Sequence, residues 1–207
     1  IKEEDRKDWI AQVKVLKAFY HFYLTRLYGP ICIVDKNLTP STSPSEVRLK
    51  RQPVDVCFKY AVDLIDEVLY DENGNEKTDL KDERPNEFFG MVDRTIAKAI
   101  KAVALVTQAS PLFNGNAEYY SNFRNVDGEL FFPMEKDNEK WKKALDAIKI
   151  AIDAAHARNK KLYKYNAEGG ANIEFFDKDI WGKSEIIEYC YNNRYSIVDP
   201  WNDELIW

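Results

Sequence analysis

Aromatic and polar side chains that could bind a sugar are concentrated near the end of the chain. The stretch after Trp181 mixes aromatic rings with amide, carboxylate and guanidinium groups. Its candidate ligand-binding residues are Tyr191, Asn192, Arg194, Tyr195 and Trp201. Sugars present flat C–H faces that stack on aromatic rings, while their hydroxyl groups need polar partners beside the ring. We therefore predict a glycan-binding platform here, with core packing or subunit contact as the alternative interpretation.

A second aromatic cluster with the same mixture of groups lies near the middle of the chain. Its members are Tyr119, Tyr120, Asn122, Phe123 and Arg124. The chain contains 14% aromatic residues, and many of them fall outside the periodic helical segments. The second cluster is a further candidate for sugar stacking, and packing in the core is again the alternative.

The segment 71–76 places oxygen-bearing side chains at alternate positions, namely Asp71, Asn73 and Asn75. This spacing resembles part of a calcium-binding loop, and the three residues are candidate calcium ligands. An EF-hand, however, needs glycine where Glu76 stands and glutamate where Asp82 stands. An ordinary Asn-Gly turn accounts for the same residues, so we predict that the chain uses no metal and no other cofactor.

The sequence contains few residue patterns that are typical of an enzyme. Its acidic pairs, such as Asp63 and Asp66, fall within a predicted helix and indicate a solvated acidic face rather than a catalytic dyad. His21 and His156 also lie within helices and are expected to have structural roles. Neither a phosphate-binding glycine loop nor a nucleophile elbow is present in the sequence. We therefore predict a binding protein without catalytic activity.

Composition excludes several classes of partner. The net charge is −5 and the isoelectric point is near 5.3, which disfavours nucleic acid because phosphates require basic clusters. No segment approaches the roughly 20 apolar residues of a membrane-spanning helix. Cys32, Cys57 and Cys190 lack the spacing of a metal site, and each is expected to be a buried free thiol.

Hydrophobic periodicity predicts a mainly helical protein. The helices are expected at about 2–28, 54–69, 86–109 and 138–158. An element at 183–191 is ambiguous between helix and strand. Long connections follow the first three helices. Loops of this length on a helical frame are typical of binding sites.

The residue pattern within each helix predicts which face is buried. The expected core stripe of the first helix comprises Val13, Leu16, Tyr20, Tyr23 and Leu27. The second helix is expected to bury Cys57, Ala61, Leu64 and Val68. The fourth is expected to bury Trp141, Leu145, Ile148, Ile152 and Ala155. The small residues of the third helix would let a neighbouring helix approach closely, and these are Ala97, Ala99, Ala102 and Ala104.

Three stretches in order resemble motifs of the SusD/RagB family of outer-membrane nutrient-binding lipoproteins. The first runs from Leu16 to Pro30, an aromatic helix that ends in Arg-Leu-Tyr-Gly. The second combines Arg51-Gln52-Pro53-Val54 with the acidic helix that follows. The third is the alanine-rich helix and the Ser-Pro-Leu-Phe-Asn-Gly run at 110–115. The specificity lies in the combination and its order.

The sequence departs from the family pattern at two positions. Lys17 stands where the family commonly has arginine, which keeps the charge but changes the hydrogen-bond geometry. The helix near Ala102 is one residue shorter than the pattern, because a basic residue often follows the alanine. A one-residue deletion would turn the rest of the helix by about 100°.

The resemblance implies a fold and a function for the whole protein. It implies a tetratricopeptide-like scaffold of helix pairs with long inserted loops, in one domain covering residues 1–207, with the organisation from about residue 180 left open. It also implies a lipid-anchored protein on the outer leaflet of the outer membrane, and the chain would be an internal part of it. Such a protein captures oligosaccharides and passes them to a SusC-like, TonB-dependent transporter.

Two alternatives to glycan capture remain open at this stage. A member of the same transport systems could bind peptides or other non-sugar nutrients, which favours backbone hydrogen bonding along an extended groove. A helical-repeat adaptor that binds only proteins would account for the helices without the resemblance.

Overall fold

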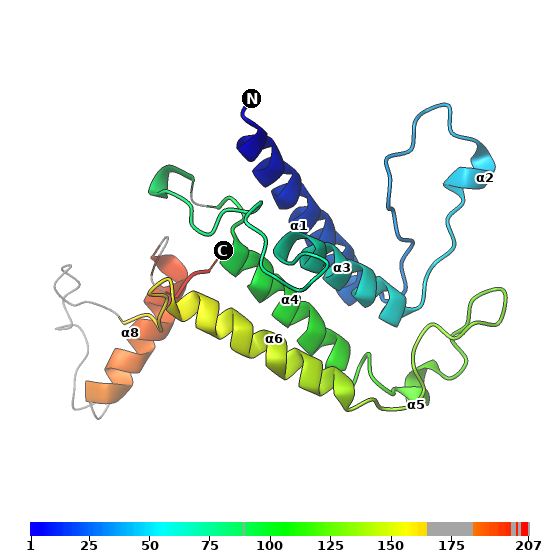
Figure 1. Ribbon diagram of the computed structural model, residues 1–207. Coiled ribbons are helices and arrows are strands. Elements are labelled where there is room, and N and C mark those ends of the chain that lie inside the picture. The colour runs from blue at the N-terminus through cyan, green and yellow to red at the C-terminus, as the bar shows by residue number, and fades with distance from the viewer. Residues whose placement is uncertain (89, 165–183, 200–201, 203, 207) are drawn as a thin grey trace. The chain divides into compact units, whose positions relative to one another are not determined.

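The computed structural model describes residues 1–88, 90–164, 184–199, 202 and 204–206. The contacts group the chain into two compact units, Ile1–Ile152 and Asp153–Trp207, and each is described by itself. The described residues contain no β-strand, only isolated bridges such as the one between Cys32 and Arg51. The prediction of a mainly α protein with long inserted loops is therefore confirmed (Figure 1).

The helices begin and end close to the predicted positions. The long ones are α1 (Glu3–Tyr28), α3 (Val54–Leu69), α4 (Arg94–Ala109), α6 (Glu139–His156) and α8 (Ser184–Val198). Short turns of helix lie in the connections, namely α2 (Pro44–Val47), η1 (Asn86–Phe88) and α5 (Ala117–Tyr120). None of the helices in the described part of the chain is long and apolar enough to cross a bilayer.

The first unit is a layered array in which α1 packs on α3 and α3 packs on α4 (Figure 1). The predicted face of α3 is confirmed, because Cys57, Ala61, Leu64 and Val68 are all buried. Ala97, Ala102 and Ala104 of α4 are buried as well, so the small residues sit where neighbouring helices approach. α6 also packs through small residues. Its Ala144, Ala147 and Ala151 contact a row on α4 that consists of Ala102, Leu105 and Ala109.

The prediction for the buried face of α1 is wrong except at Leu16, which packs against the core. Val13 is 63% exposed, Tyr20 60% and Leu27 55%, and Tyr23 is exposed as well. The core-facing side instead carries mostly smaller residues, which are Asp8, Ala11, Gln12, Val15, Ala18, His21, Phe22 and Thr25. A helix surface of alanine, valine and threonine lets α3 approach closely, and this close packing decides the orientation.

The same correction applies to α6. Trp141, Leu145 and Ile152 are 41%, 50% and 47% exposed, whereas its buried positions are alanines. Ile148 and Ala155 agree with the prediction, since Ile148 packs against the core and Ala155 is buried. Packing between alanine rows again accounts for the difference, because large side chains on both helices would hold the axes apart.

α4 begins later than predicted, at Arg94 rather than near residue 86. Asp93 is its N-cap, and the carboxylate accepts a hydrogen bond from the backbone N–H of Ile96 at 2.8 Å. The preceding Asn86–Phe88 is a separate 3₁₀ turn. From Arg94 the helix is uninterrupted through Ala102 to Ala109, with both alanines buried. The cysteines are all free, but only Cys57 is buried, and Cys190 is exposed.

A buried ion pair fixes the long connection between α3 and α4 to α1. The Arg84 guanidinium donates to both carboxylate oxygens of Asp8 at 2.7 and 2.8 Å, and to the carbonyl of Val92. Asp8 also accepts hydrogen bonds from the Lys81 N–H and the Gln12 amide. Both charged side chains are at most 5% exposed, so this pair orders the loop from within the core.

A second anchor holds the connection after α1. His21 Nδ1 donates to the Lys17 carbonyl at 2.8 Å, and its Nε2 accepts from the Val34 N–H at 3.2 Å, which defines the tautomer. Asp35 accepts from the Tyr60 hydroxyl at 2.9 Å and pairs with the Lys17 ammonium. Hydrogen bonds from Tyr60 and Lys17 lower the pKa of Asp35. The structural role predicted for His21 is therefore confirmed.

Candidate functional site

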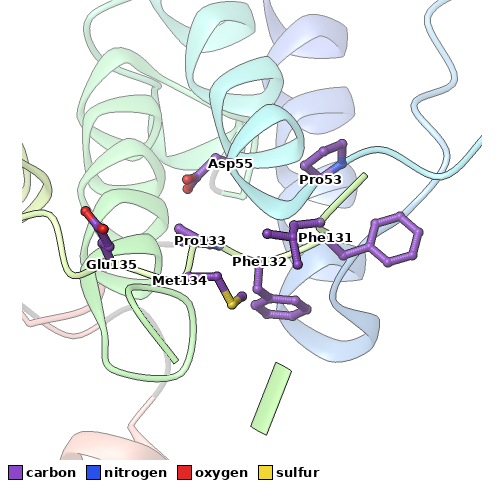
Figure 2. A pocket seen from close by; sticks show the side chains of 8 residues that line it. Pro53, Asp55, Phe131, Phe132, Pro133, Met134 and Glu135 are labelled. Atoms are coloured by element: carbon purple, nitrogen blue, oxygen red, sulfur yellow. The ribbon is translucent and has the colours of Figure 1, made fainter. Parts of the chain in front are cut away.

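A pocket of about 470 Å³ lies between the start of α3 and the loop before α6 (Figure 2). Its lining is mostly apolar with carboxylates at one side, and comprises Pro53, Asp55, Leu130, Phe131, Phe132, Pro133, Met134 and Glu135. Figure 2 shows Pro53, Phe131, Phe132 and Met134 gathered together, with Asp55 and Glu135 beside them. An apolar wall with few placed polar groups is the usual composition of a ligand site.

A layer of stacked rings supports the pocket wall. The ring of Tyr120 stacks on Phe132 with centroids 3.8 Å apart and planes 12° apart, and Phe113 stacks on Phe132 from 6.0 Å. Phe123 contacts Phe131 at 5.0 Å. Phe131 and Phe132 are each only 4% exposed, so the wall is a rigid part of the core. The side chains at the opening are the half-buried Leu130, Pro133 and Met134.

Arg51 ties the aromatic layer to the loop that precedes α3. Its Nε donates to the Pro30 carbonyl at 2.7 Å, and its guanidinium lies 5.5 Å from the Phe123 ring and 5.2 Å from the Phe131 ring. These distances are within the range of cation–π attraction. Arg51, the basic residue of the second family-like motif, therefore contacts the rings that form and support the pocket wall. The sequence alone assigned no role to it.

The turn 124–130 is fastened to the same loop by ion pairs. The Lys50 ammonium pairs with Asp127 and, at 3.0 Å, with Glu129. The hydrogen bond from Lys50 lowers the pKa of Asp127, and the same bond raises the pKa of Lys50. The backbone N–H of Val54 donates to the Phe131 carbonyl at 2.9 Å, which continues the connection to the first turn of α3.

Asp55 is held in place by two residues from other helices. Its carboxylate accepts from the Lys140 ammonium at 2.6 and 2.8 Å and from the Gln108 amide at 2.9 Å. Lys140 lies in the first turn of α6 and Gln108 in the last turn of α4. The paired carboxylate is available as a fixed hydrogen-bond acceptor.

The Ser-Pro-Leu-Phe-Asn-Gly run builds the floor on which the pocket loop rests. Phe113 is 3% exposed and meets Phe58 edge to face at 5.1 Å. Asn114 is 4% exposed, and its amide donates to the Asp137 carbonyl at 2.8 Å while its oxygen accepts from the Asp137 N–H at 2.9 Å. Asn114 thus pairs with the backbone of the pocket loop as a neighbouring strand would.

Asn114→Ala is expected to weaken this connection. The substitution removes the partner of the Asp137 N–H and C=O and of the buried Ala109 carbonyl. Each ordinary hydrogen bond contributes about 0.5–1.5 kcal/mol, and water can replace Asn114 at the exposed Asp137. We expect hydrogen exchange at 131–137 to be faster in the variant than in the parent protein, with α3 unchanged, together with a lower free energy of unfolding. Exchange measured by mass spectrometry checks the result, and equal protection of the loop in both proteins would contradict the role of Asn114.

Gly29 places the end of α1 directly against the pocket wall. It caps α1 with φ +71° and its N–H donates to the Thr25 carbonyl at 2.8 Å. A Cβ atom at this position would lie 3.3 Å from the Phe132 ring. The glycine of the Arg-Leu-Tyr-Gly run therefore serves both the helix cap and the close approach to Phe132.

The structure places the second predicted cluster behind and beside the pocket. Tyr120 and Phe123 support the wall, while Tyr119 is 75% exposed and points away from the core. Asn122 is exposed, and Arg124 donates to the Gly128 carbonyl. The lining residues Phe131 to Met134 were missed by the sequence analysis. The Phe-Phe-Pro-Met run after the turn at Gly128 was the signal that could have indicated them.

In the second unit, α8 brings together part of the predicted tail platform. The rings of Tyr191 and Tyr195 stack with centroids 5.8 Å apart and planes 8° apart, and Arg194 lies 6.0 Å from the Tyr195 ring. Asn192 is half-buried on the same helix. The ambiguous element is thus a helix, and it extends to Val198. Trp201 lies outside the described residues, so the complete platform stays a prediction.

The candidate calcium ligands form a turn. The Asp71 carboxylate accepts from the backbone N–H groups of Asn73 and Asn75 at 2.9 and 2.8 Å, and from the Asn75 side-chain amide at 3.0 Å. These hydrogen bonds, led by those from Asn75, lower the pKa of Asp71. Among the described residues, no group of three or more His, Cys, Asp or Glu side chains could hold a metal ion.

The fold and the pocket define a helical scaffold that carries a loop-built pocket. Among solved structures, the fold of this chain is similar to that of BT4246. One structure of BT4246 superposes with a TM-score of 0.79 and 26% sequence identity. The match covers 99% of this chain and 35% of the BT4246 chain. A structure of the selenomethionine form of BT4246 has a TM-score of 0.72 and 26% sequence identity. That match covers 95% of this chain and 32% of the BT4246 chain. This chain therefore spans about a third of the length of BT4246.

A more distant similarity is to a SusD-like protein (BF3747) from Bacteroides fragilis NCTC 9343. It has a TM-score of 0.48 at 13% identity, over 74% of this chain and 22% of its own. That score is too low to carry an argument. No family model matches the sequence, and no curated protein shows significant sequence similarity to it.

Proposed function

We propose that this chain is part of a SusD/RagB-type lipoprotein that captures oligosaccharides at the cell surface and passes them to a TonB-dependent, SusC-like transporter. The protein would be anchored by lipid to the outer leaflet of the outer membrane. It would bind and release its ligand without covalent chemistry. The resemblance of the motifs within residues 16–116 to those of the family supports the proposal, and the similarity in fold to BT4246 agrees with the helical scaffold that the resemblance implies.

The observation that carries the proposal is the pocket beside Asp55. Pro53, Pro133 and Met134 offer an apolar surface to the C–H face of a sugar, and Asp55 and Glu135 offer acceptors for its hydroxyl groups. The wall is rigid because the family-like motifs hold it, through Gly29, Arg51 and Asn114. A preformed site loses little conformational entropy when it binds a flexible oligosaccharide.

The experiment that tests the proposal is calorimetric titration of the complete mature protein with a panel of host, plant and microbial oligosaccharides. Glu135→Gln changes only an exposed side chain at the opening of the pocket, whereas Met134→Ala also removes a side chain that packs against the cluster containing Phe131 and Phe132, so its melting temperature is measured alongside binding. We expect saturable binding of one glycan class, and each variant should weaken it at least about tenfold, or about 1.4 kcal/mol. Tyr119→Ala is the matched control, since this exposed ring lies outside the lining.

The other outcomes distinguish the alternatives. Glycan binding that ignores the pocket variants but is lost in Tyr195→Ala or Trp201→Ala would move the site to the tail and keep the function. Binding of a peptide panel, with no glycan bound, would replace sugar capture by peptide capture. Turnover of any glycan by the purified protein would contradict the absence of catalysis.

A further inference from the structure

The pocket beside Asp55 presents acceptor side chains to a ligand (Figure 2). Among the described residues that line it, no side chain carries an N–H or O–H donor, because the lining consists of apolar side chains and the carboxylates of Asp55 and Glu135. Two of the lining residues are prolines, which also lack a backbone N–H. The N–H of Phe131 is used within the protein, since it donates to the Phe123 carbonyl at 3.3 Å. A ligand that forms hydrogen bonds with these side chains must therefore supply the donors.

The two carboxylates keep acceptor positions for such a ligand. Asp55 Oδ1 accepts from Gln108 and Lys140, whereas Oδ2 accepts from Lys140 alone among the described residues. An ionised carboxylate has about four lone-pair sites, so Oδ2 can accept a further hydrogen bond. Glu135 is exposed, and its side chain has no hydrogen bond or ion pair within the described part of the chain. The hydroxyl groups of a sugar are matching donors.

The positive groups beside the pocket are used within the protein. The Lys140 side chain is only 11% exposed, and its ammonium binds both oxygens of Asp55. The start of α3 would by itself favour an anion through its helix dipole, but Asp55 lies in the first turn and compensates this effect. The first N–H of the helix, that of Val54, donates to the Phe131 carbonyl at 2.9 Å. None of these groups is left to attract an anionic ligand.

Glu135 therefore gives the opening of the pocket an uncompensated negative charge. Lys136, the next residue, is exposed, lies outside the lining and forms no ion pair with Glu135 within the described residues. A carboxylate or sulfate group on a ligand would meet a like charge here and would find no side-chain donor. We propose that the pocket selects uncharged glycans, whose hydroxyl groups donate to Asp55 and Glu135, and rejects acidic glycans. This inference rests on the proposed function and adds the class of substrate to it.

The test compares each glycan with a partner of the same backbone and different charge. The complete mature protein is titrated calorimetrically with neutral hexasaccharides of glucose, mannose and galactose, each beside its uronate form oxidised at the primary hydroxyl. Oligogalacturonate and oligomannuronate are titrated beside their carboxyl-reduced forms. We expect the neutral member of the bound pair to bind at least about tenfold more tightly at low salt. The preference should shrink as salt is raised, because ions screen the repulsion at the exposed Glu135.

Glu135→Gln tests whether this carboxylate is the cause of the preference. The neutral glycan loses an acceptor, whereas the acidic glycan loses a like charge and gains an amide donor, so we expect the preference to disappear. Glu118→Gln is the matched control, because it makes the same change of charge on an exposed residue of α5 outside the lining. The preference should be the same in this control as in the parent protein.

The outcomes separate this inference from the proposed function. Equal or tighter binding of the acidic member would overturn the selectivity and leave glycan capture intact. A preference for the neutral member that persists in Glu135→Gln would overturn its assignment to this pocket. Binding of none of these sugars would contradict the proposed function itself, and the inference with it.

Discussion

Asp8→Ala is expected to lower the free energy of unfolding by about 3–5 kcal/mol, because it strands the Arg84 guanidinium in the interior. The Arg84 side chain is 5% exposed, and its hydrogen bonds to Asp8 measure 2.7 and 2.8 Å. The Lys81 N–H would lose its acceptor as well. Urea unfolding of the two proteins measures the difference. A loss below about 1 kcal/mol would mean that the loop between α3 and α4 does not depend on this pair.

The matched control is Asp5→Ala on the same helix. Asp5 is exposed and lies 3.9 Å from the Lys81 ammonium, so its ion pair is solvated. Exposed pairs of this kind contribute about 0–1 kcal/mol. The losses of unfolding free energy in Asp8→Ala and Asp5→Ala are therefore compared. Their ratio separates the contribution of the buried pair from the general effect of removing an acidic side chain from the first turns of α1.

The same pair predicts how stability depends on pH. Burial alone would raise the pKa of Asp8, but hydrogen bonds from Arg84, Lys81 and Gln12 outweigh it and hold the pKa below the ordinary value of 3.8. The stabilisation is therefore complete above pH 3.8 and is lost as the pH falls through the lower pKa of the folded state. We expect Asp8→Asn to show a shallower loss of stability in acid than the parent protein.

Gly115→Ala is expected to have the second large effect, about 3 kcal/mol or more of lost stability. Gly115 has φ +79°, and a Cβ atom there would lie 2.5 Å from the Lys136 nitrogen and 2.9 Å from the Glu135 carbonyl carbon. Both atoms belong to the backbone, which cannot rotate away as a side chain could. The pocket loop would have to shift, so ligand binding should weaken together with stability.

Gly128→Ala separates the effect of the steric clash from the effect of the left-handed backbone conformation. Gly128 has a similar φ of +86°, but a Cβ atom there would meet nothing within 4 Å, so only backbone strain remains. That strain costs about 1–2 kcal/mol. Urea unfolding of both variants checks the prediction. Equal losses would show that the contact with the pocket loop contributes nothing, and that the left-handed conformation alone requires glycine in the motif.

Local sequence was sufficient for most of the helices and for the ends of α1 and α4. α1 ends at Gly29 and α4 at Ser110, as the Gly-Pro and Ser-Pro pairs predict, and the alanines of α4 lie at close helix contacts. Caps and turns depend on residues that are adjacent in the chain, so their chemistry can be read without knowing the neighbours. The start of α4 was predicted too early, although Gly90, which has φ +90°, and the N-cap residue Asp93 separate the earlier residues from the helix.

The pocket could be predicted only in part. The aromatic cluster at 119–124 lies beside the pocket, where Tyr120 and Phe123 support the wall, and its predicted role in sugar stacking stays a prediction. The lining itself depends on contacts between distant residues, such as Asp55 with Lys140 and Lys50 with Asp127. No local pattern marks such pairs. Their side chains meet only after the helices have packed.

The sequence by itself determined the helical class, the C-terminal ends of α1 and α4 and the residues of the family-like motifs. Only the tertiary structure decided which face of α1 and of α6 is buried. Periodicity identified an apolar stripe on each helix, but both helices also carry a second face of small residues. Close approach between helix axes favours the small residues, since dispersion contacts and backbone packing both improve there. The larger side chains of both helices are consequently left on the outside.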